Sequence, residues 1–362
     1  MTSSIGIYIH IPFCKSKCLY CDFHSVAGME ENYDIYVKAL IMELAYHANS
    51  QCDARVSSIF FGGGTPSVLS STNINNIIRA TSEGYRLNNN IEITIESNPE
   101  TLTLDKLKSY KSAGINRLSV GVQSFDDMAL KYLGRNHTSK EARQAIHLAR
   151  LADFPQLSAD FMFGLPDQTI GQWQKELNRI SALDLDHVSA YELTLEPGTP
   201  MWKDGNKIQK ANTMAMFDLT ESKLTKSGYN HYEISNYCKP QLHCSHNLGY
   251  WNYKNYIGIG ASAHGFMNGK RYSNVKKIES YINRVMKSGK AIYKTETITN
   301  KKERIERLML GLRLKNGIPL ANIELTPKIN DLINVNLLAI SGKKLKATRK
   351  GWRILDSLLE NI

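Results

Sequence analysis

Apolar runs alternate with longer amphipathic stretches along the first 195 residues of the chain. The apolar runs are rich in Ile, Val, Phe and Tyr, which is typical of strands buried on both faces of a sheet. Each is seven to nine residues long, and they cover residues 6–13, 56–64, 91–97, 115–122, 157–164 and 187–195. The stretches between them, such as 33–48 and 169–183, have a helical pattern. Six strand–helix units in succession require parallel strands joined by right-handed crossovers.

This pattern predicts an α/β fold in which the six units form a partial (β/α)6 TIM-like barrel. In such folds the chemistry lies at the C-terminal ends of the strands. Polar or glycine-rich residues end or follow five of the six predicted strands, at Cys14, 62–66, 96–100, 121–125 and 164–166. We therefore expect a functional site at this edge of the barrel.

The regular alternation ends near residue 195. Residues 196–295 predict an irregular α+β extension, which is aromatic and glycine-rich between residues 238 and 266. Residues 296–362 read as two helices, short strands and a final helix over 349–362, as in a small winged-helix-like module. The chain is thus expected to contain a barrel (1–195), an extension (196–295) and a C-terminal module (296–362).

The net charge of +11 is concentrated at the C-terminal end of the chain. The segment from Met267 to Ile362 holds 21 Lys and Arg against 8 Asp and Glu, which is +13 and leaves −2 for the other residues. Such a segment suits an acidic partner, an anionic membrane surface or nucleic acid, although a solvated lysine-rich surface would give the same numbers. No dense basic run with interleaved aromatic residues is present, so we do not expect nucleic acid as a partner.

The sequence has no feature of a membrane-spanning or exported protein. No run of 18 apolar residues occurs, and the N-terminus lacks a basic region followed by an apolar stretch. Six cysteines are too few and too clustered for a disulfide framework. We expect a cytoplasmic protein, with a membrane contact that is at most peripheral.

Three cysteines lie within eight positions directly after the first predicted strand. Cys14, Cys18 and Cys21 form C-x3-C-x2-C, and Phe23 stands where a fourth cysteine would complete C-x-C. Zinc would need a fourth ligand, which His24 can offer, whereas a four-iron cluster can use three cysteines and keep one iron open. The spacing alone leaves both alternatives open. The glycine turn at 62–64, which lets backbone amides approach a carboxylate or amine, points to a ligand beside the metal centre.

These motifs resemble the radical S-adenosylmethionine (SAM) superfamily, whose signature has an aromatic residue, here Tyr20, before the last cysteine. The resemblance implies a 4Fe–4S cluster on Cys14, Cys18 and Cys21, with SAM bound at the open iron. The order of YIHIPFC, FGGGTPS, ESNPE, RLSVGVQSF, LGRNH and GLPDQT is similar to the coproporphyrinogen III dehydrogenase (HemN) group. Carried over by position, that similarity implies a SAM site lined by Tyr8, Tyr20, Gly63, Gly64, Thr65, Glu96, Gln123, Arg135 and Asp160.

Two features narrow the resemblance to the haem chaperone (HemW) branch of that group. The dehydrogenases carry a fourth cysteine where this chain has Phe23, and HNLGYW at 246–251 matches the branch motif H-N-x-x-Y-W. The resemblance implies that His246 is an axial ligand of haem iron and that Tyr250 and Trp251 cover the porphyrin. Cys244 is a candidate thiol contact, whereas His264 is expected to serve packing.

The implied function is to bind haem and deliver it to an acceptor protein of unknown identity, as a monomer or a dimer. The cluster and SAM would regulate or prime this delivery, and no residue is assigned a catalytic role. The alternative is an enzyme, the oxygen-independent coproporphyrinogen III oxidase that decarboxylates its substrate by radical SAM chemistry. A third reading, a zinc-stabilised nucleic-acid-binding protein, predicts zinc and no iron. Whether SAM is cleaved and whether haem is held covalently are left open by the sequence.

Overall fold

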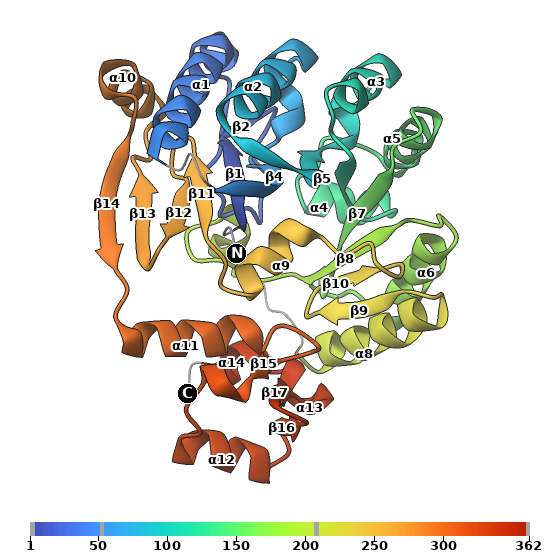
Figure 1. Cartoon of the computed structure of the whole chain (residues 1–362). Coiled ribbons are helices and arrows are strands. Elements are labelled where there is room, and N and C mark those ends of the chain that lie inside the picture. Colours follow the sequence, from blue (N-terminus) through green and yellow to red (C-terminus); the bar gives the residue numbers. More distant parts are fainter. Residues whose placement is uncertain (1–3, 51–53, 206–209, 360–362) are drawn as a thin grey trace.

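The computed structural model describes residues 4–50, 54–205 and 210–359, and its centre is one twelve-stranded sheet (Figure 1). Six adjacent strands are parallel and follow the chain order: β1 (Ser4–Ile11), β4 (Arg55–Gly63), β5 (Arg86–Ser97), β6 (Arg117–Gln123), β7 (Gln156–Phe163) and β8 (His187–Glu192). These are the six predicted strands, and the predicted α/β partial barrel is confirmed. β5 begins earlier than expected because its polar start still pairs with β4, with Arg86 opposite Arg55 and Leu87 opposite Val56.

Helices connect these strands and lie in an arc outside them (Figure 1). They are α1 (Tyr33–Ser50), α2 (Ser71–Gly84), α3 (Leu104–Ser112), α4 (Asp127–Tyr132), α5 (Ser139–Leu151) and α6 (Ile170–Ser181), with short 3₁₀ helices at Glu30–Asn32, Pro66–Val68 and Pro99–Thr101. In β1, Ile5, Ile7 and Ile9 are fully buried in the core and alternate with Tyr8 and His10 on the other face. Because side chains alternate along a strand, apolar residues face the helices and polar or aromatic ones face the inside of the barrel.

The extension adds strands to both edges of the same sheet. At one edge β10 (Asn236–Cys238) and β9 (Asn230–Glu233) continue from β8. At the other, β11 (Tyr256–Ile259) runs parallel to β1 and is followed by the antiparallel β12 (His264–Met267), β13 (Lys270–Asn274) and β14 (Ile292–Thr297). The helices of this segment are α7 (Pro200–Lys203), α8 (Lys210–Lys226), α9 (Ser245–Trp251) and α10 (Ile278–Ser288). One apolar core extends from Ile5 to Ala291, so barrel and extension are packed as a unit.

A buried carboxylate fixes the extension to the barrel. Glu43 of α1 is fully buried and accepts hydrogen bonds from Gly260 N (2.9 Å), Asn274 Nδ2 (2.8 Å) and the Tyr281 hydroxyl (2.6 Å). Burial raises the pKa of Glu43 to about 7. The turn that leads from β11 to β12 is therefore held to α1 by hydrogen bonds as well as by packing.

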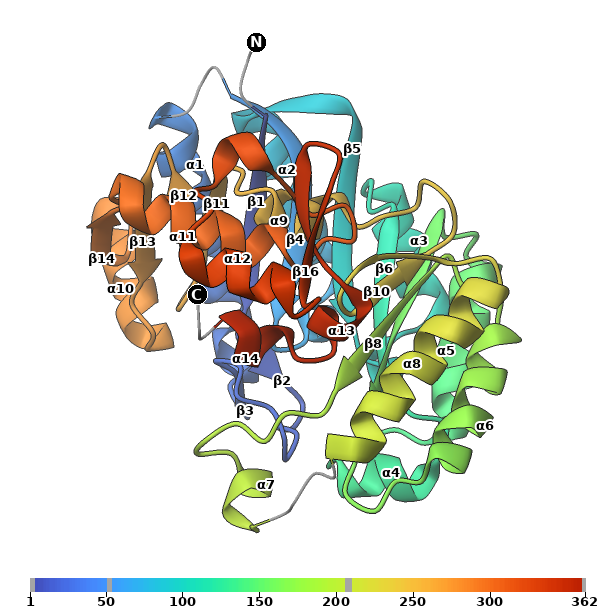
Figure 2. The ribbon, with the colours of Figure 1, turned by 90° about the horizontal axis from the view of Figure 1, so that it is seen from below.

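The C-terminal module has its own core and lies on the open side of the arc (Figures 1 and 2). Its elements are α11 (Asn300–Gly311), β15 (Ile318–Pro319), a 3₁₀ helix (Leu320–Asn322), α12 (Pro327–Asn334), β16 (Leu338–Ser341), β17 (Lys344–Ala347), α13 (Arg349–Trp352) and α14 (Leu355–Leu359). Helices around a three-stranded antiparallel sheet are as expected for a winged-helix-like module, except that the predicted final helix is divided in two. Arg353 and Arg349 pair with Asp218 and Glu221 of α8 and so hold the module to the extension.

In the part of the chain that the structure describes, no helix is long and apolar enough to cross a membrane.

Candidate functional site

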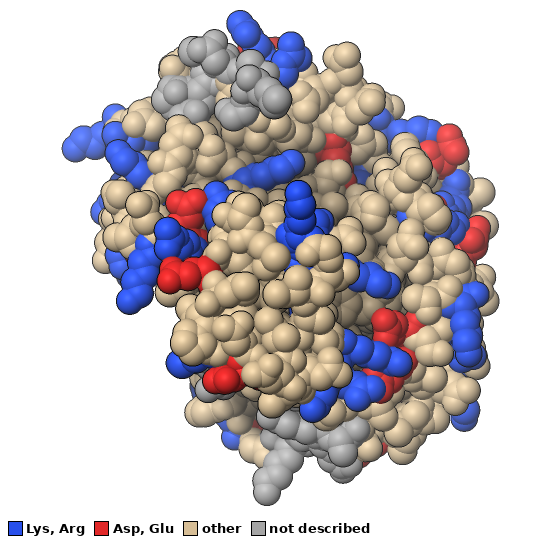
Figure 3. Space-filling model, turned by 60° about the horizontal axis from the view of Figure 1, so that its bottom comes forward, with Lys and Arg blue, Asp and Glu red and all other residues tan. Residues whose placement is uncertain are grey.

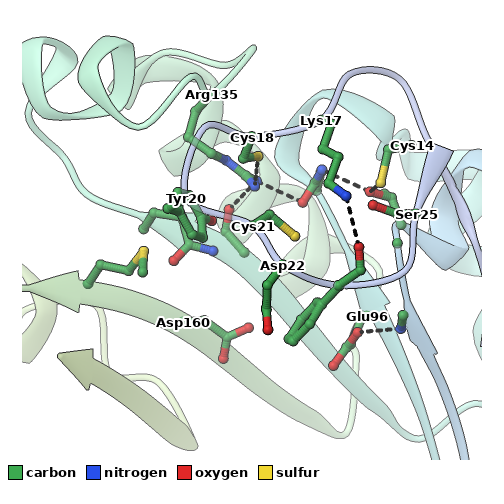
Figure 4. Close-up of a pocket in the computed structure, with 18 of the residues that line it drawn as sticks. Cys14, Lys17, Cys18, Tyr20, Cys21, Asp22, Ser25, Glu96, Arg135 and Asp160 are labelled. Carbon is green, nitrogen blue, oxygen red and sulfur yellow. Dashed lines mark hydrogen bonds between the residues drawn. The ribbon is translucent and has the colours of Figure 1, made fainter. Parts of the chain in front are cut away.

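A cavity of about 370 Å³ lies at the C-terminal ends of the parallel strands, where the sequence predicts the site (Figure 4). Its walls come from the loop after β1 and from the ends of β4 to β8. All three motif cysteines line it. So do eight of the nine residues predicted to bind SAM: Tyr20, Gly63, Gly64, Thr65, Glu96, Gln123, Arg135 and Asp160. Tyr8 lines a neighbouring cavity instead, since it lies in the middle of β1 rather than at its end.

The cysteine loop leaves the barrel through the short strand β2 (Phe13–Cys14), which pairs with β3 (Val26–Ala27). Cys14 is buried, whereas Cys18 and Cys21 are half-buried, and the three lie along one loop in Figure 4. The Cys18 sulfur lies 3.3 Å from Arg135 Nη1, so a cation is available to a thiolate there. Burial raises the pKa of the Cys21 thiol. The loop presents three sulfur donors to the cavity, and three cysteine thiolates are a donor set that suits an iron–sulfur cluster.

The glycine turn after β4 packs directly against the cysteine loop. Backbone amides of Gly64 and Thr65 donate to Ile11 O and Phe13 O, both at 2.8 Å. A Cβ on Gly64 would lie 2.6 Å from Phe13 O and 2.9 Å from the Cys14 sulfur. Gly63 has φ +113°, a conformation that L side chains rarely adopt. The turn was predicted to admit a ligand, and the structure adds a second reason for glycine, since Gly64 leaves room for a cysteine sulfur.

Two half-buried carboxyl groups, Glu96 and Asp160, line the cavity on the side opposite Cys21 in Figure 4. Burial, and next the charge of Asp160, raise the pKa of Glu96 to about 8. Burial also raises the pKa of Asp160. Gly63 N donates to Glu96 Oε2 (3.3 Å) and the Ser119 hydroxyl lies 3.3 Å from Asp160. Both carboxyl groups can accept further hydrogen bonds from the amino or hydroxyl groups of a bound molecule.

Arg135 and a residue that sequence reasoning missed, Asn98, complete the wall. Arg135 Nη2 donates to Asn98 Oδ1 (2.7 Å) and Gly121 O (2.8 Å), while Asn98 Nδ2 donates to Thr65 Oγ1 (3.2 Å). Burial lowers the pKa of Arg135, but the charges of Tyr20, Cys18 and Glu100 raise it by more, so the pKa of Arg135 stays above its usual value. The position of Asn98 directly after a strand, in the polar segment 96–100, is the signal that could have identified it.

Three polar atoms of the cavity walls are buried and have no hydrogen-bond partner among the described residues. They are Arg135 Nε and the hydroxyls of Ser25 and Ser97. Burying a polar group without a partner costs about 1–3 kcal/mol, so such atoms mark places where a ligand is expected to supply the partner. An unused guanidinium N–H suits a carboxylate and an unused hydroxyl suits a polar ligand group. The walls therefore fit an amino acid derivative such as SAM.

The single-zinc alternative needs His24 as a ligand, and that side chain already has a partner. Among the residues that the structure describes, no three side chains of His, Cys, Asp or Glu converge to hold one metal ion. His24, the fourth ligand that zinc would need, has its Nε2 2.7 Å from Lys276 O.

A second cavity, of about 310 Å³, adjoins the first on the concave side of β1 and β11. The two share Phe23, Gly63 and Glu96. The wall of the second cavity is largely aromatic and includes Tyr8, Phe23, Tyr250 and Tyr256. We call it the aromatic cavity. Phe23, which is 60% exposed, thus stands between the cysteine loop and the aromatic cavity.

The H-N-x-x-Y-W motif forms α9, but only one of its predicted haem contacts faces the aromatic cavity. Tyr250 lines it, whereas His246 and Trp251 do not. His246 is 3% exposed, its Nδ1 lies 2.9 Å from the Ser58 hydroxyl and its Nε2 lies 2.9 Å from the Tyr250 hydroxyl. Burial lowers the pKa of His246 to about 3. Ligation of haem iron by His246 would require one of these hydrogen bonds to break.

Trp251 and Cys244 also lie apart from the aromatic cavity. The Trp251 ring stacks under the guanidinium of Arg313 from the C-terminal module. Cys244 is buried at the start of α9, with its sulfur 3.7 Å from Glu92 Oε1. Burial and the Glu92 charge raise the pKa of this thiol to about 12.

Comparison with known proteins gives a consistent result over the whole chain. Residues 8–180 match the model of the radical SAM superfamily and residues 298–354 that of the HemN C-terminal domain. The heme chaperone HemW of Bacillus subtilis is 35% identical over 320 residues, which cover 86% of this chain and 84% of that protein. HemW of Escherichia coli K12 is 34% identical over 376 residues, covering 98% and 97%. The crystal structure of E. coli coproporphyrinogen III oxidase (HemN), at 22% identity, superposes with a TM-score of 0.86 over 99% of this chain and 90% of that one, and so shares the fold.

Proposed function

Because this chain belongs to the HemW family within the radical SAM superfamily, we propose that it binds haem and delivers it to an acceptor protein. The observation that carries the proposal is that Tyr250 of the family motif lines an aromatic cavity beside the cysteine loop. The cavity shares Phe23 with the cysteine site, and Phe23 replaces the fourth cysteine of the dehydrogenases. Aromatic walls suit the flat, apolar faces of a porphyrin.

In this proposal Cys14, Cys18 and Cys21 hold a 4Fe–4S cluster beside bound SAM. When bound, the cluster supplies an open iron for SAM and a source of one electron. Gly63 and Gly64 allow close approach of the backbone, and the free N–H of Arg135 receives a carboxylate. Tyr20, Thr65, Glu96, Gln123 and Asp160 complete the site, with the carboxyl groups accepting hydrogen bonds from amine and hydroxyl groups. Tyr8, whose hydroxyl lies 3.0 Å from His10 Nδ1, lines the adjoining aromatic cavity.

An anaerobic haem titration of cluster-containing protein tests the function. We expect one haem to bind per chain with a shifted Soret band, and we expect no protoporphyrinogen IX when the same sample receives SAM, reductant and coproporphyrinogen III. The reason is that Phe23 stands where the dehydrogenases carry a fourth cysteine, and that Tyr250 of the α9 motif lines the adjoining aromatic cavity. Steady formation of protoporphyrinogen IX with little affinity for haem would contradict the proposal and favour the enzyme.

We further propose that the C-terminal module makes a peripheral contact with anionic membrane surfaces. Basic side chains are spread over this face of the molecule and acidic ones are fewer (Figure 3). Lys343, Lys344, Lys346 and Lys350 have no ion pair with any described residue, and Val335, whose carbonyl oxygen lies 3.5 Å from Lys350 Nζ, is 53% exposed. Lysines around an exposed apolar side chain suit the interface of an anionic bilayer.

The expected result is co-sedimentation with vesicles that contain phosphatidylserine but not with neutral vesicles, weakening as salt is raised. The triple substitution Lys343→Glu, Lys344→Glu and Lys346→Glu should remove the binding, since each lysine near an anionic surface contributes about 1 kcal/mol. A matched control is Lys38→Glu, Lys140→Glu and Lys175→Glu, which changes the net charge equally on the helices of the barrel. Equal binding by both triple variants, or binding that salt does not change, would rule out this contact.

A further inference from the structure

Three imidazoles line the aromatic cavity, and His264 is the one whose two ring nitrogens are both without a hydrogen bond to a described residue. His10 Nδ1 lies 3.0 Å from the Tyr8 hydroxyl and its Nε2 lies 3.0 Å from His24 O. His24 Nε2 lies 2.7 Å from Lys276 O. His264, the first residue of β12, is exposed, and its ring makes no hydrogen bond or ion pair with a described residue. A ring nitrogen that faces a cavity without a partner is free to coordinate a metal.

We infer that His264 is the axial ligand of the haem iron and that the porphyrin lies against the aromatic wall formed by Tyr250, Tyr256 and Phe23. The inference rests on the proposed function, because it names the ligand within the same haem site. It departs from the motif-based expectation, which assigned the iron to His246 and packing to His264. His246 instead holds Tyr250 in the cavity wall through the 2.9 Å hydrogen bond from its ring.

The electrostatic surroundings of His264 suit this role. Partial burial, then Arg271 and Lys276, lower its pKa, so the ring is neutral and its lone pair is available at neutral pH. Arg271 is held by Glu306 through two hydrogen bonds of 3.0 and 2.7 Å, but Lys276 is exposed and has no ion pair with a described residue. An ammonium group beside the iron ligand can pair with a haem propionate.

The backbone that carries His264 is held firmly, as a metal ligand requires. β12 pairs with β13, where His264 lies opposite Ser273. On the other side, the backbone of Gly258 approaches so closely that a Cβ there would lie 1.8 Å from His264 O. The turn before β12 is tied to α1 by Glu43 through Gly260. The Tyr250 and Tyr256 rings meet edge to face at 4.6 Å, which gives the wall a fixed shape.

The test is a haem titration of the full-length, cluster-containing chain with His264→Ala, His246→Ala and, as a matched control on the exposed face of α5, His147→Ala. We expect His264→Ala to lose the Soret shift that the wild type shows and to weaken haem binding by at least the ~10- to 100-fold that loss of a metal's outer-shell partner costs. His246→Ala should keep the Soret position of the wild type, and His147→Ala should match it in affinity as well. The cluster absorbance should be the same in all samples.

Added imidazole separates ligation from a structural role. In His264→Gly, imidazole should occupy the vacated position and restore the wild-type Soret spectrum, which it would not do if the residue only stabilised the fold. An unchanged spectrum and affinity in His264→Ala, or rescue by imidazole in His246→Gly but not in His264→Gly, would overturn the inference and leave haem binding intact. Absence of haem binding by the wild-type chain would instead remove the proposed function itself.

Discussion

Gly64→Ala is expected to prevent assembly of the iron–sulfur cluster although all three cysteines remain in place. The added Cβ would lie 2.6 Å from Phe13 O and 2.9 Å from the Cys14 sulfur, distances at which real Cβ contacts essentially never occur. One of these neighbours is backbone, so the strain cannot be relieved by a rotamer change. The cysteine loop must move away from the end of β4, and Cys14 moves with it. Iron content and cluster absorbance after anaerobic reconstitution should fall to the level of Cys18→Ala.

A glycine substitution in open surroundings provides the control. Gly171 lies in α6, where the nearest atom to an added Cβ is Thr169 Oγ1 at 4.0 Å. Gly171→Ala should reconstitute like the wild type and be slightly more stable, because alanine is favoured over glycine in a helix by about 1 kcal/mol. If Gly64→Ala assembled a cluster with the wild-type spectrum and iron content, the turn would not be what positions Cys14.

That the predicted site residues gather in one cavity could be foreseen from the sequence, because they follow successive parallel strands. The C-terminal ends of such strands meet at one edge of the sheet, which is why eight of nine expected SAM contacts line one cavity. Tyr8 is the exception, and the strand pattern explains it. It lies six residues before Cys14, in the middle of β1, where it pairs with Phe60 and Gly258. Its side chain therefore faces the inside of the barrel further from the C-terminal ends of the strands than the other eight residues.

The surroundings of the residues proposed to contact haem were harder to predict, because they depend on pairings between distant segments. The Nδ1 of His246 is hydrogen-bonded to the hydroxyl of Ser58, which lies 188 residues earlier in the chain, and no local sequence pattern reveals that contact. Its bond to Tyr250 was visible in principle, since residues four apart share a helix face. His264 was expected to pack, yet it is exposed. Its neighbours in the cavity come from α9, β11 and the cysteine loop, which only the assembled sheet brings together.

Phe23 connects the two cavities in a way that the motifs alone did not suggest. A phenylalanine in place of the fourth cysteine was first an argument against a dehydrogenase. In the structure the same side chain lines both the cysteine cavity and the aromatic cavity, and its carbonyl accepts a hydrogen bond from Lys17 Nζ (3.1 Å) in the cysteine loop. A movement of the cysteine loop would therefore also move Phe23, which belongs to the wall on which we place the porphyrin.

Glu92→Leu is expected to destabilise the protein and to impair haem binding, because Glu92 of β5 caps the helix that carries the motif. Its carboxylate accepts hydrogen bonds from Ser245 N (2.8 Å), His246 N (2.9 Å) and the Cys244 thiol (3.7 Å). Cys244, the N-cap residue of α9, provides no side-chain cap of its own. Leucine would leave two buried backbone donors without partners, at about 1–3 kcal/mol each, so the free energy of unfolding should fall by roughly 2–5 kcal/mol.

Two matched variants separate the cap from other effects of the substitution. Glu92→Gln keeps one acceptor oxygen and should lose only part of that free energy. Glu83→Leu removes a 73% exposed carboxylate and should change stability by no more than about 0.5 kcal/mol. The measurements are urea unfolding and haem titration on the same samples, with affinity expected to follow stability in the order wild type, Gln, Leu, because Tyr250 lies one turn beyond the capped end. Wild-type haem affinity in a clearly destabilised Glu92→Leu would mean that the position of α9 does not govern the haem site.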